Sequence, residues 1–169
     1  MDRVAQLLQG QGDYSGAEPL LREALEAKRE VLGDRHPDTL ASINNLGLLL
    51  QDKGDLQGAE PLYREALEAR REVLGDRHQN TLSSIGHLAD LQRERSDLDA
   101  ASATLGDTVA VATEVLGPTH LITLVTEARA ARIALARTGS DELLRDVVRR
   151  METALGVQDP QTVKYAALL

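Results

Sequence analysis

Three of the four histidines recur at one fixed interval along the sequence. His36, His78 and His120 are separated from one another by 42 residues. Histidine is a common metal ligand, but a zinc ion needs its ligands about 2 Å away. Equivalent positions in successive repeats lie much farther apart, so we predict no metal site and expect these histidines at turns or helix starts. His87 lies outside this interval and could make binding at its own position mildly pH-sensitive.

The sequence contains no arrangement of residues that is typical of catalysis or of cofactor binding. The glycine-rich stretch that begins at Gly10 is not a dinucleotide-binding GxGxxG motif and follows no predicted strand. Phosphate-loop, HExxH and GxSxG motifs are absent from the sequence. Because the chain has no cysteine, disulfides, thiol chemistry and cysteine-ligated metals are excluded. We therefore predict a protein that is not an enzyme and that has no cofactor.

The net charge of the chain argues against some classes of binding partner. The chain of 169 residues has 19 Lys and Arg against 27 Asp and Glu, which gives a formal net charge of −8. This acidity argues against a general nucleic-acid binder and against binding to anionic membrane surfaces. No apolar run approaches the roughly 20 residues that span a bilayer, so we predict no membrane insertion. We expect a soluble protein in the cytoplasm.

Internal repetition is the dominant feature of the sequence. Residues 16–28 return almost unchanged at 58–70, an offset of 42 residues. A third copy is more divergent, with Ser96 where the second has Gly54, and a fourth keeps only the outline. A fixed period of this length indicates a repeat protein.

The sequence of each repeat predicts two helices. In the second repeat, apolar residues between Leu40 and Leu50 follow one another at spacings of three or four, which is typical of an amphipathic helix. Gly54 ends this helix, and a second is expected from about Leu56 to Leu74. One such hairpin cannot bury its apolar face alone, so neighbouring hairpins must stack.

This pattern predicts an all-α fold, a right-handed α-solenoid of about four helix–turn–helix hairpins. A core built from Leu, Val, Ile and Ala agrees with the aromatic content of 2%. We predict a single domain, residues 1–169, with repeats at about 1–40, 41–82, 83–124 and 125–163 and the start of a further or capping helix at 164–169.

The repeat resembles the tetratricopeptide repeat, in the 42-residue form of kinesin light chains and nephrocystin-like proteins. The stretch from His36 to Gly75 carries the resemblance, which extends over almost the whole chain. The resemblance implies a scaffold that binds a protein or peptide, whose identity the sequence does not give. The partner segment would lie along a concave face formed mainly by the first helix of each repeat.

The resemblance also implies which residues would line this groove. Asn45 matches the position where family members commonly carry an asparagine that contacts the bound peptide, and an amide can both donate and accept hydrogen bonds. The predicted row is cationic at its ends and acidic in the middle. The residues expected to bind the peptide are Arg3, Gln6, Asn44, Asn45, Leu48, His87, Asp90, Arg129 and Arg132.

A second hypothesis is a structural or assembly subunit that docks into a larger complex through its ends or its convex face. Residues 164–169 resemble the beginning of another helix, and solenoids normally need polar terminal caps. The sequence leaves both hypotheses open.

Overall fold

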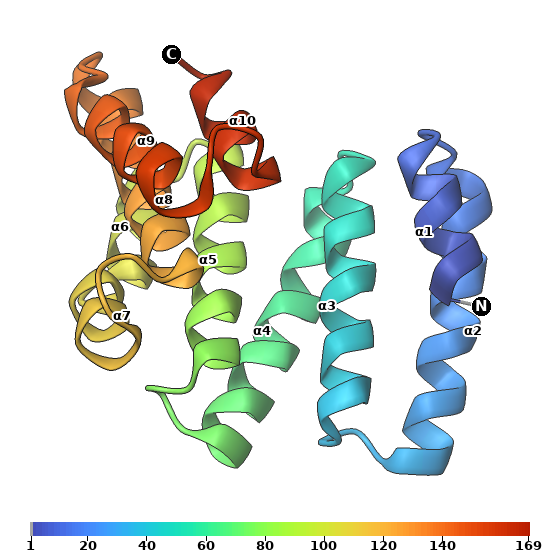
Figure 1. The fold of residues 1–169 in the computed structure, drawn as a ribbon. Helices are drawn as coiled ribbons and strands as arrows, with labels where there is room; N and C mark the ends of the chain where they lie inside the picture. Colours follow the sequence, from blue (N-terminus) through green and yellow to red (C-terminus); the bar gives the residue numbers. More distant parts are fainter. Residues whose placement is uncertain (1) are drawn as a thin grey trace. The chain divides into compact units, whose positions relative to one another are not determined.

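The computed structural model describes residues 2–169, apart from the side chains of Asp2, Arg3 and Gln6. Every regular element in this range is a helix, so the predicted all-α class is confirmed. Contacts divide the chain into two compact units, Met1–Asp76 and Arg77–Leu169 (Figure 1). The first unit contains α1 (Asp2–Gly10), α2 (Tyr14–Leu32), α3 (Pro37–Asp52) and α4 (Leu56–Leu74). The second contains α5 (Gln79–Glu94), α6 (Leu98–Leu105), α7 (Thr108–Leu116), α8 (Leu121–Thr138), α9 (Glu142–Leu155) and α10 (Pro160–Ala166).

In the first unit, α2 and α4 both pack against α3. The apolar positions of α3 that the sequence spacing predicts, such as Ile43 and Leu46, are buried. Gly47 allows α3 and the Tyr63 ring of α4 to approach closely, because a Cβ atom there would lie 2.8 Å from Cε1 of Tyr63. The hydroxyl of Tyr63 donates to Oε1 of Gln51 at 2.7 Å. Tyr63 therefore buries its ring and still has a hydrogen-bond partner for its hydroxyl.

The turn after the first helix has the same form in both units. Gly54 has a positive φ of 85°, as is usual for the residue that ends a helix. Asp55 then caps α4 by accepting a hydrogen bond from a backbone N–H three residues later. In the second unit, Ser96 keeps a positive φ of 62° and Asp97 caps α6 in the same way. The turn therefore keeps its conformation with serine in place of glycine.

The second helix of the third repeat is interrupted. Whereas α4 runs unbroken from Leu56 to Leu74, α6 ends at Leu105 and α7 begins at Thr108. Gly106 lies between them with φ 39° and ψ −123°, which is not a helical conformation. The prediction of two helices per repeat is therefore wrong for this repeat. Glycine at the position of Arg64 has a much lower helix propensity and admits a positive φ.

The C-terminal helix completes the core of the second unit. The carboxylate of Asp159 caps α10, which begins at Pro160, four residues before the position 164 that the sequence indicates. Tyr165 is fully buried and belongs to one cluster with Leu124, Ala128 and Met151. Short as it is, α10 covers apolar surface of α8 and α9 (Figure 1).

Candidate functional site

The three regularly spaced histidines begin helices. His36 precedes α3, His78 precedes α5 and His120 precedes α8, and in each case Nδ1 accepts a hydrogen bond from the backbone N–H two residues later. The distances from Nδ1 to that nitrogen are 3.2, 3.1 and 3.2 Å. The interpretation of these residues as helix starts is confirmed. Within the described part of the chain, no group of three His, Cys, Asp or Glu side chains could hold a metal ion.

In the first unit, the predicted binding row is only partly exposed. Arg3 and Gln6 lie outside the residues whose side chains the structure describes. On α3, Asn45 is exposed and Leu48 is half-buried, but Asn44 retains only 7% of its accessible surface. Asn45 is therefore the residue of this row that α3 presents most openly.

In the second unit, three members of the predicted row meet one another. Nε of Arg129 on α8 donates to Oδ2 of Asp90 on α5 at 2.7 Å, and Nη1 of Arg132 lies 3.5 Å from Oδ1 of the same carboxylate. The side chains are 9%, 11% and 16% exposed for Arg129, Asp90 and Arg132. His87 is half-buried on the neighbouring turn of α5. Asp90 therefore bridges two arginines of another helix, an arrangement that the sequence did not predict, and the three side chains together keep one positive charge.

The electrostatics of Asp90 follow from this geometry. Burial alone would raise the pKa of its carboxyl, but the charge and hydrogen bond of Arg129, together with Arg132, lower the pKa below its ordinary value. A glycine makes room for the pair, since a Cβ atom at Gly86 would lie 2.2 Å from Nη1 of Arg129. Asp90 is thus a carboxylate at neutral pH, and it holds α5 to α8.

Two further residues beside this pair were not predicted from the sequence. Tyr165 on α10 is fully buried, and the Cζ atom of Arg132 lies 5.8 Å from its ring centroid. Burial raises the pKa of Tyr165, so its phenol stays protonated at neutral pH. Burial likewise lowers the pKa of Arg93 at the end of α5, with the positive charge of Arg132 contributing. Tyr165 lies in a part of the sequence where the repeat is hardly recognisable, and Arg93 is not among the residues predicted to bind the peptide.

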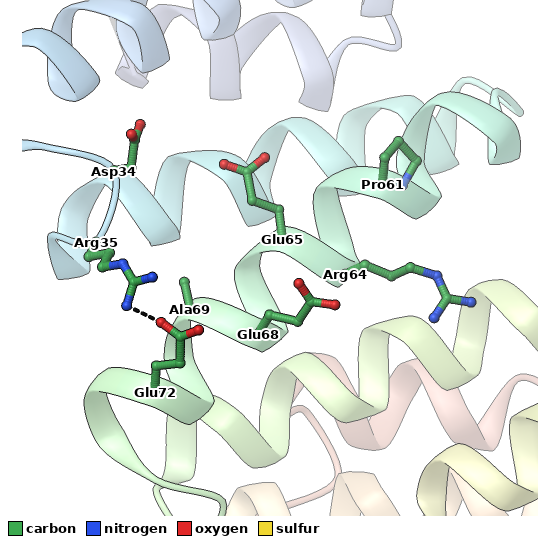
Figure 2. A pocket seen from close by; sticks show the side chains of 8 residues that line it. All are labelled: Asp34, Arg35, Pro61, Arg64, Glu65, Glu68, Ala69 and Glu72. Atoms are coloured by element: carbon green, nitrogen blue, oxygen red, sulfur yellow. Dashed lines mark ion pairs between the residues drawn. The ribbon is translucent and has the colours of Figure 1, made fainter.

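A separate hollow of about 550 Å³ lies on the first unit, between the loop after α2 and one face of α4 (Figure 2). Figure 2 shows Arg35 in this loop pointing toward Glu72, with which it forms an ion pair. Arg29 on α2 binds Glu65 at 2.6 Å and approaches Asp34 at 3.4 Å. The hollow is lined by Asp34, Arg35, Pro61, Arg64, Glu65, Glu68, Ala69 and Glu72.

None of the helices in residues 2–169 is both long enough and apolar enough to cross a membrane. The family model of the tetratricopeptide repeat matches residues 1–72 and 40–114. The chain belongs to the tetratricopeptide repeat family. Tetratricopeptide repeats generally mediate protein–protein interactions.

Solved structures share this fold. The TPR-like repeats of a Podosopora anserina protein named as a kinesin light chain match with a TM-score of 0.75 and 25% identity, over 96% of this chain and 79% of theirs. A form of these repeats with a single substitution gives a TM-score of 0.76 and 24% identity, over 96% and 78%. BtubC (BKLC) of P. vanneervenii gives 0.69 and 19%, over 91% and 59%. The α-solenoid class and the kinesin-light-chain-like type of repeat are thereby confirmed. No curated protein sequence matches this one.

Proposed function

We propose that this tetratricopeptide repeat protein is a non-catalytic scaffold that binds a peptide or protein segment through the polar faces of its first helices, in the cytoplasm. The observation that carries the proposal is the exposure of Asn45 on a helix whose other side chains are mostly buried. His87 occupies the equivalent position 42 residues later and is half-buried. A bound peptide backbone needs its polar groups hydrogen-bonded, and both side chain types can provide partners.

The ion pairs of the second unit change the recognition that we propose. Because Asp90 binds both Arg129 and Arg132, these three residues offer a partner one net positive charge and not the separate cationic and acidic positions that the sequence predicts. Arg129 in particular keeps 9% of its side-chain surface. We therefore assign direct contact mainly to Asn45 and His87, and to the three charged residues the role of holding the surface in place.

The test begins with the identification of a partner by proximity labelling or by pull-down and mass spectrometry. The variant Asn45→Ala with His87→Ala is then expected to bind that partner about tenfold more weakly, since each replacement removes about one hydrogen bond. Gln57→Ala, an exposed amide on α4, is the matched control and should bind like the parent protein. Circular dichroism should show the same helix content for all three proteins. Unchanged affinity of the double variant would contradict the proposal.

Docking into a larger assembly through another face is the second candidate. The hollow on α4 favours it, because its concave surface carries charges of both signs, with four carboxylates and the guanidinium groups of Arg35 and Arg64 in its lining. Glu68→Lys should then weaken binding to a partner that the Asn45→Ala, His87→Ala variant still binds normally. The opposite pattern would assign the partner to the first helices. Light scattering after size exclusion adds a second measurement, since a monomer at all concentrations would exclude assembly of copies through the ends.

A further inference from the structure

We propose that the second unit binds a small oxyanion, a carboxylate or a phosphate group, beside Arg93, Arg132 and Tyr165 on α5, α8 and α10. Arg93 lies at the C-terminal end of α5, and Tyr165 belongs to the hydrophobic core of the second unit. It does not depend on the peptide-binding function proposed above, because its evidence does not involve Asn45 or His87 and its test uses small anions rather than a peptide.

The charges of this cluster do not balance. Arg93, Arg129 and Arg132 bring three guanidinium groups together, whereas Asp90 and Glu94 supply two carboxylates. Both oxygens of Asp90 are already engaged, one by Arg129 and one by Arg132. Oε1 of Glu94 lies 3.2 Å from Nη2 of Arg93. One positive charge is therefore left without a counterion in a largely buried environment, which is costly unless an anion compensates it.

Two buried donors in this cluster lack an acceptor. Arg132 can only donate to the hydroxyl of Tyr165, so the proton of that hydroxyl, like the proton on Nε of Arg93, meets no acceptor among the described residues. Buried polar atoms are nearly always paired, and an unpaired one costs about 1–3 kcal/mol. Both groups are donors here, because burial raises the pKa of Tyr165 and keeps its phenol protonated. Both groups lack a hydrogen-bond acceptor, and an oxyanion has several acceptor oxygens.

The cluster is accessible from solvent. The side chains of Arg132 and Arg93 are 16% and 19% exposed, so part of each side chain reaches the surface. Lys164 is exposed next to them, with Nζ 5.8 Å from the ring centroid of Tyr165. An anion from solution would thus meet an ammonium group first and two guanidinium groups further in. Arg129 is too deeply buried to take part directly.

The test measures the binding of inorganic phosphate and of acetate to the whole chain by calorimetry. Thermal unfolding in either anion is compared with unfolding in chloride at the same ionic strength. At least one anion should raise the Tm of the parent protein in a concentration-dependent way, since a ligand of the folded state stabilises it. Tyr165→Phe removes one donor and should weaken binding up to about tenfold. Arg93→Gln removes a charged donor and should weaken it by about tenfold or more. Arg149→Gln, an exposed arginine on α9, should leave the response unchanged.

The outcomes separate the explanations. A stronger response to phosphate assigns the site to a phosphate group, and a stronger response to acetate assigns it to a carboxylate. Equal Tm values in phosphate, acetate and chloride would overturn the proposal, as would Tyr165→Phe and Arg93→Gln proteins that respond like the parent. If Arg93→Gln loses its helical circular dichroism, Tyr165→Phe carries the test, because it keeps the buried ring. The Asn45→Ala, His87→Ala variant should retain the anion response, so failure of peptide binding and failure of anion binding are distinguishable.

Discussion

The two units use the same position of the first helix in different ways. On α3 of the first unit this position is Leu48, which is half-buried, whereas on α5 of the second unit it is Asp90. One repeat further, on α8, it is Arg132, and the last two residues form an ion pair. The spacing of the helices is thus compatible with an apolar side chain or with a charged pair at one repeat position.

The ion pair between Lys53 and Glu18 in the first unit is more exposed, with 42% and 20% of the two side chains accessible. Nζ of Lys53, after α3, binds Oε2 of Glu18 on α2 at 2.8 Å. The hydrogen bonds from Lys53 and Arg22 lower the pKa of Glu18. Exposed pairs of this kind contribute at most about 1 kcal/mol, since water screens them. The first unit thus has a screened pair at this surface, whereas the second has a buried charge network around Asp90.

The largest expected effect that tests this contrast is the loss of Asp90. Asp90→Ala leaves Arg129 buried without its carboxylate and should lower the free energy of unfolding by about 3–5 kcal/mol. Urea denaturation measures the change. Asp141→Ala, which removes the partner of exposed Arg145, is the control and should cost much less. Equal losses for the two variants would show that the buried pair is no more important than a surface pair.

A smaller effect tests what the units share. Asp55→Ala in the first unit and Asp97→Ala in the second each remove a helix cap, and each should lower the free energy of unfolding by about 1 kcal/mol. The capping distances are similar, 2.9 Å from Asp55 and 3.1 Å from Asp97 to the backbone nitrogen. Thermal and urea unfolding of both variants measure the loss. A cost confined to one unit would mean that the common turn does not stabilise the two alike.

The smallest expected effect is a change in the free energy of unfolding at acidic pH. Because the pKa of Asp90 is lowered below its ordinary value of 3.8, the unfolded chain binds a proton more readily than the folded one. The stability that Asp90 contributes is therefore complete above 3.8 and is lost as the pH falls through its lower folded pKa. The difference in unfolding free energy between the parent and Asp90→Asn should shrink over that acidic range. A difference that stays constant from neutral pH to acid would contradict this assignment.

Much of the fold could be predicted from local sequence. The offset of 42 residues, the apolar spacing of α3 and the bounds of α4 all follow from patterns within one repeat. The break at Gly106 could not be placed in advance, because a glycine weakens a helix without determining whether the chain turns there. Asn44 is buried although it was predicted with the exposed row, since its neighbours in space are set by packing and not by its own type.

The sequence by itself determined the repeats, the helical class and the residues that begin α3 and α4, because capping and apolar periodicity act over a few residues. Only the tertiary structure decided that Asp90 and Arg129, which are 39 positions apart, form a pair, and that Tyr165 lies buried beside them. Those contacts depend on how helices from different repeats approach one another. A charge on a helix face looks the same in the sequence whether it meets water or an opposite charge, so its role appears only once the neighbouring helix is in place.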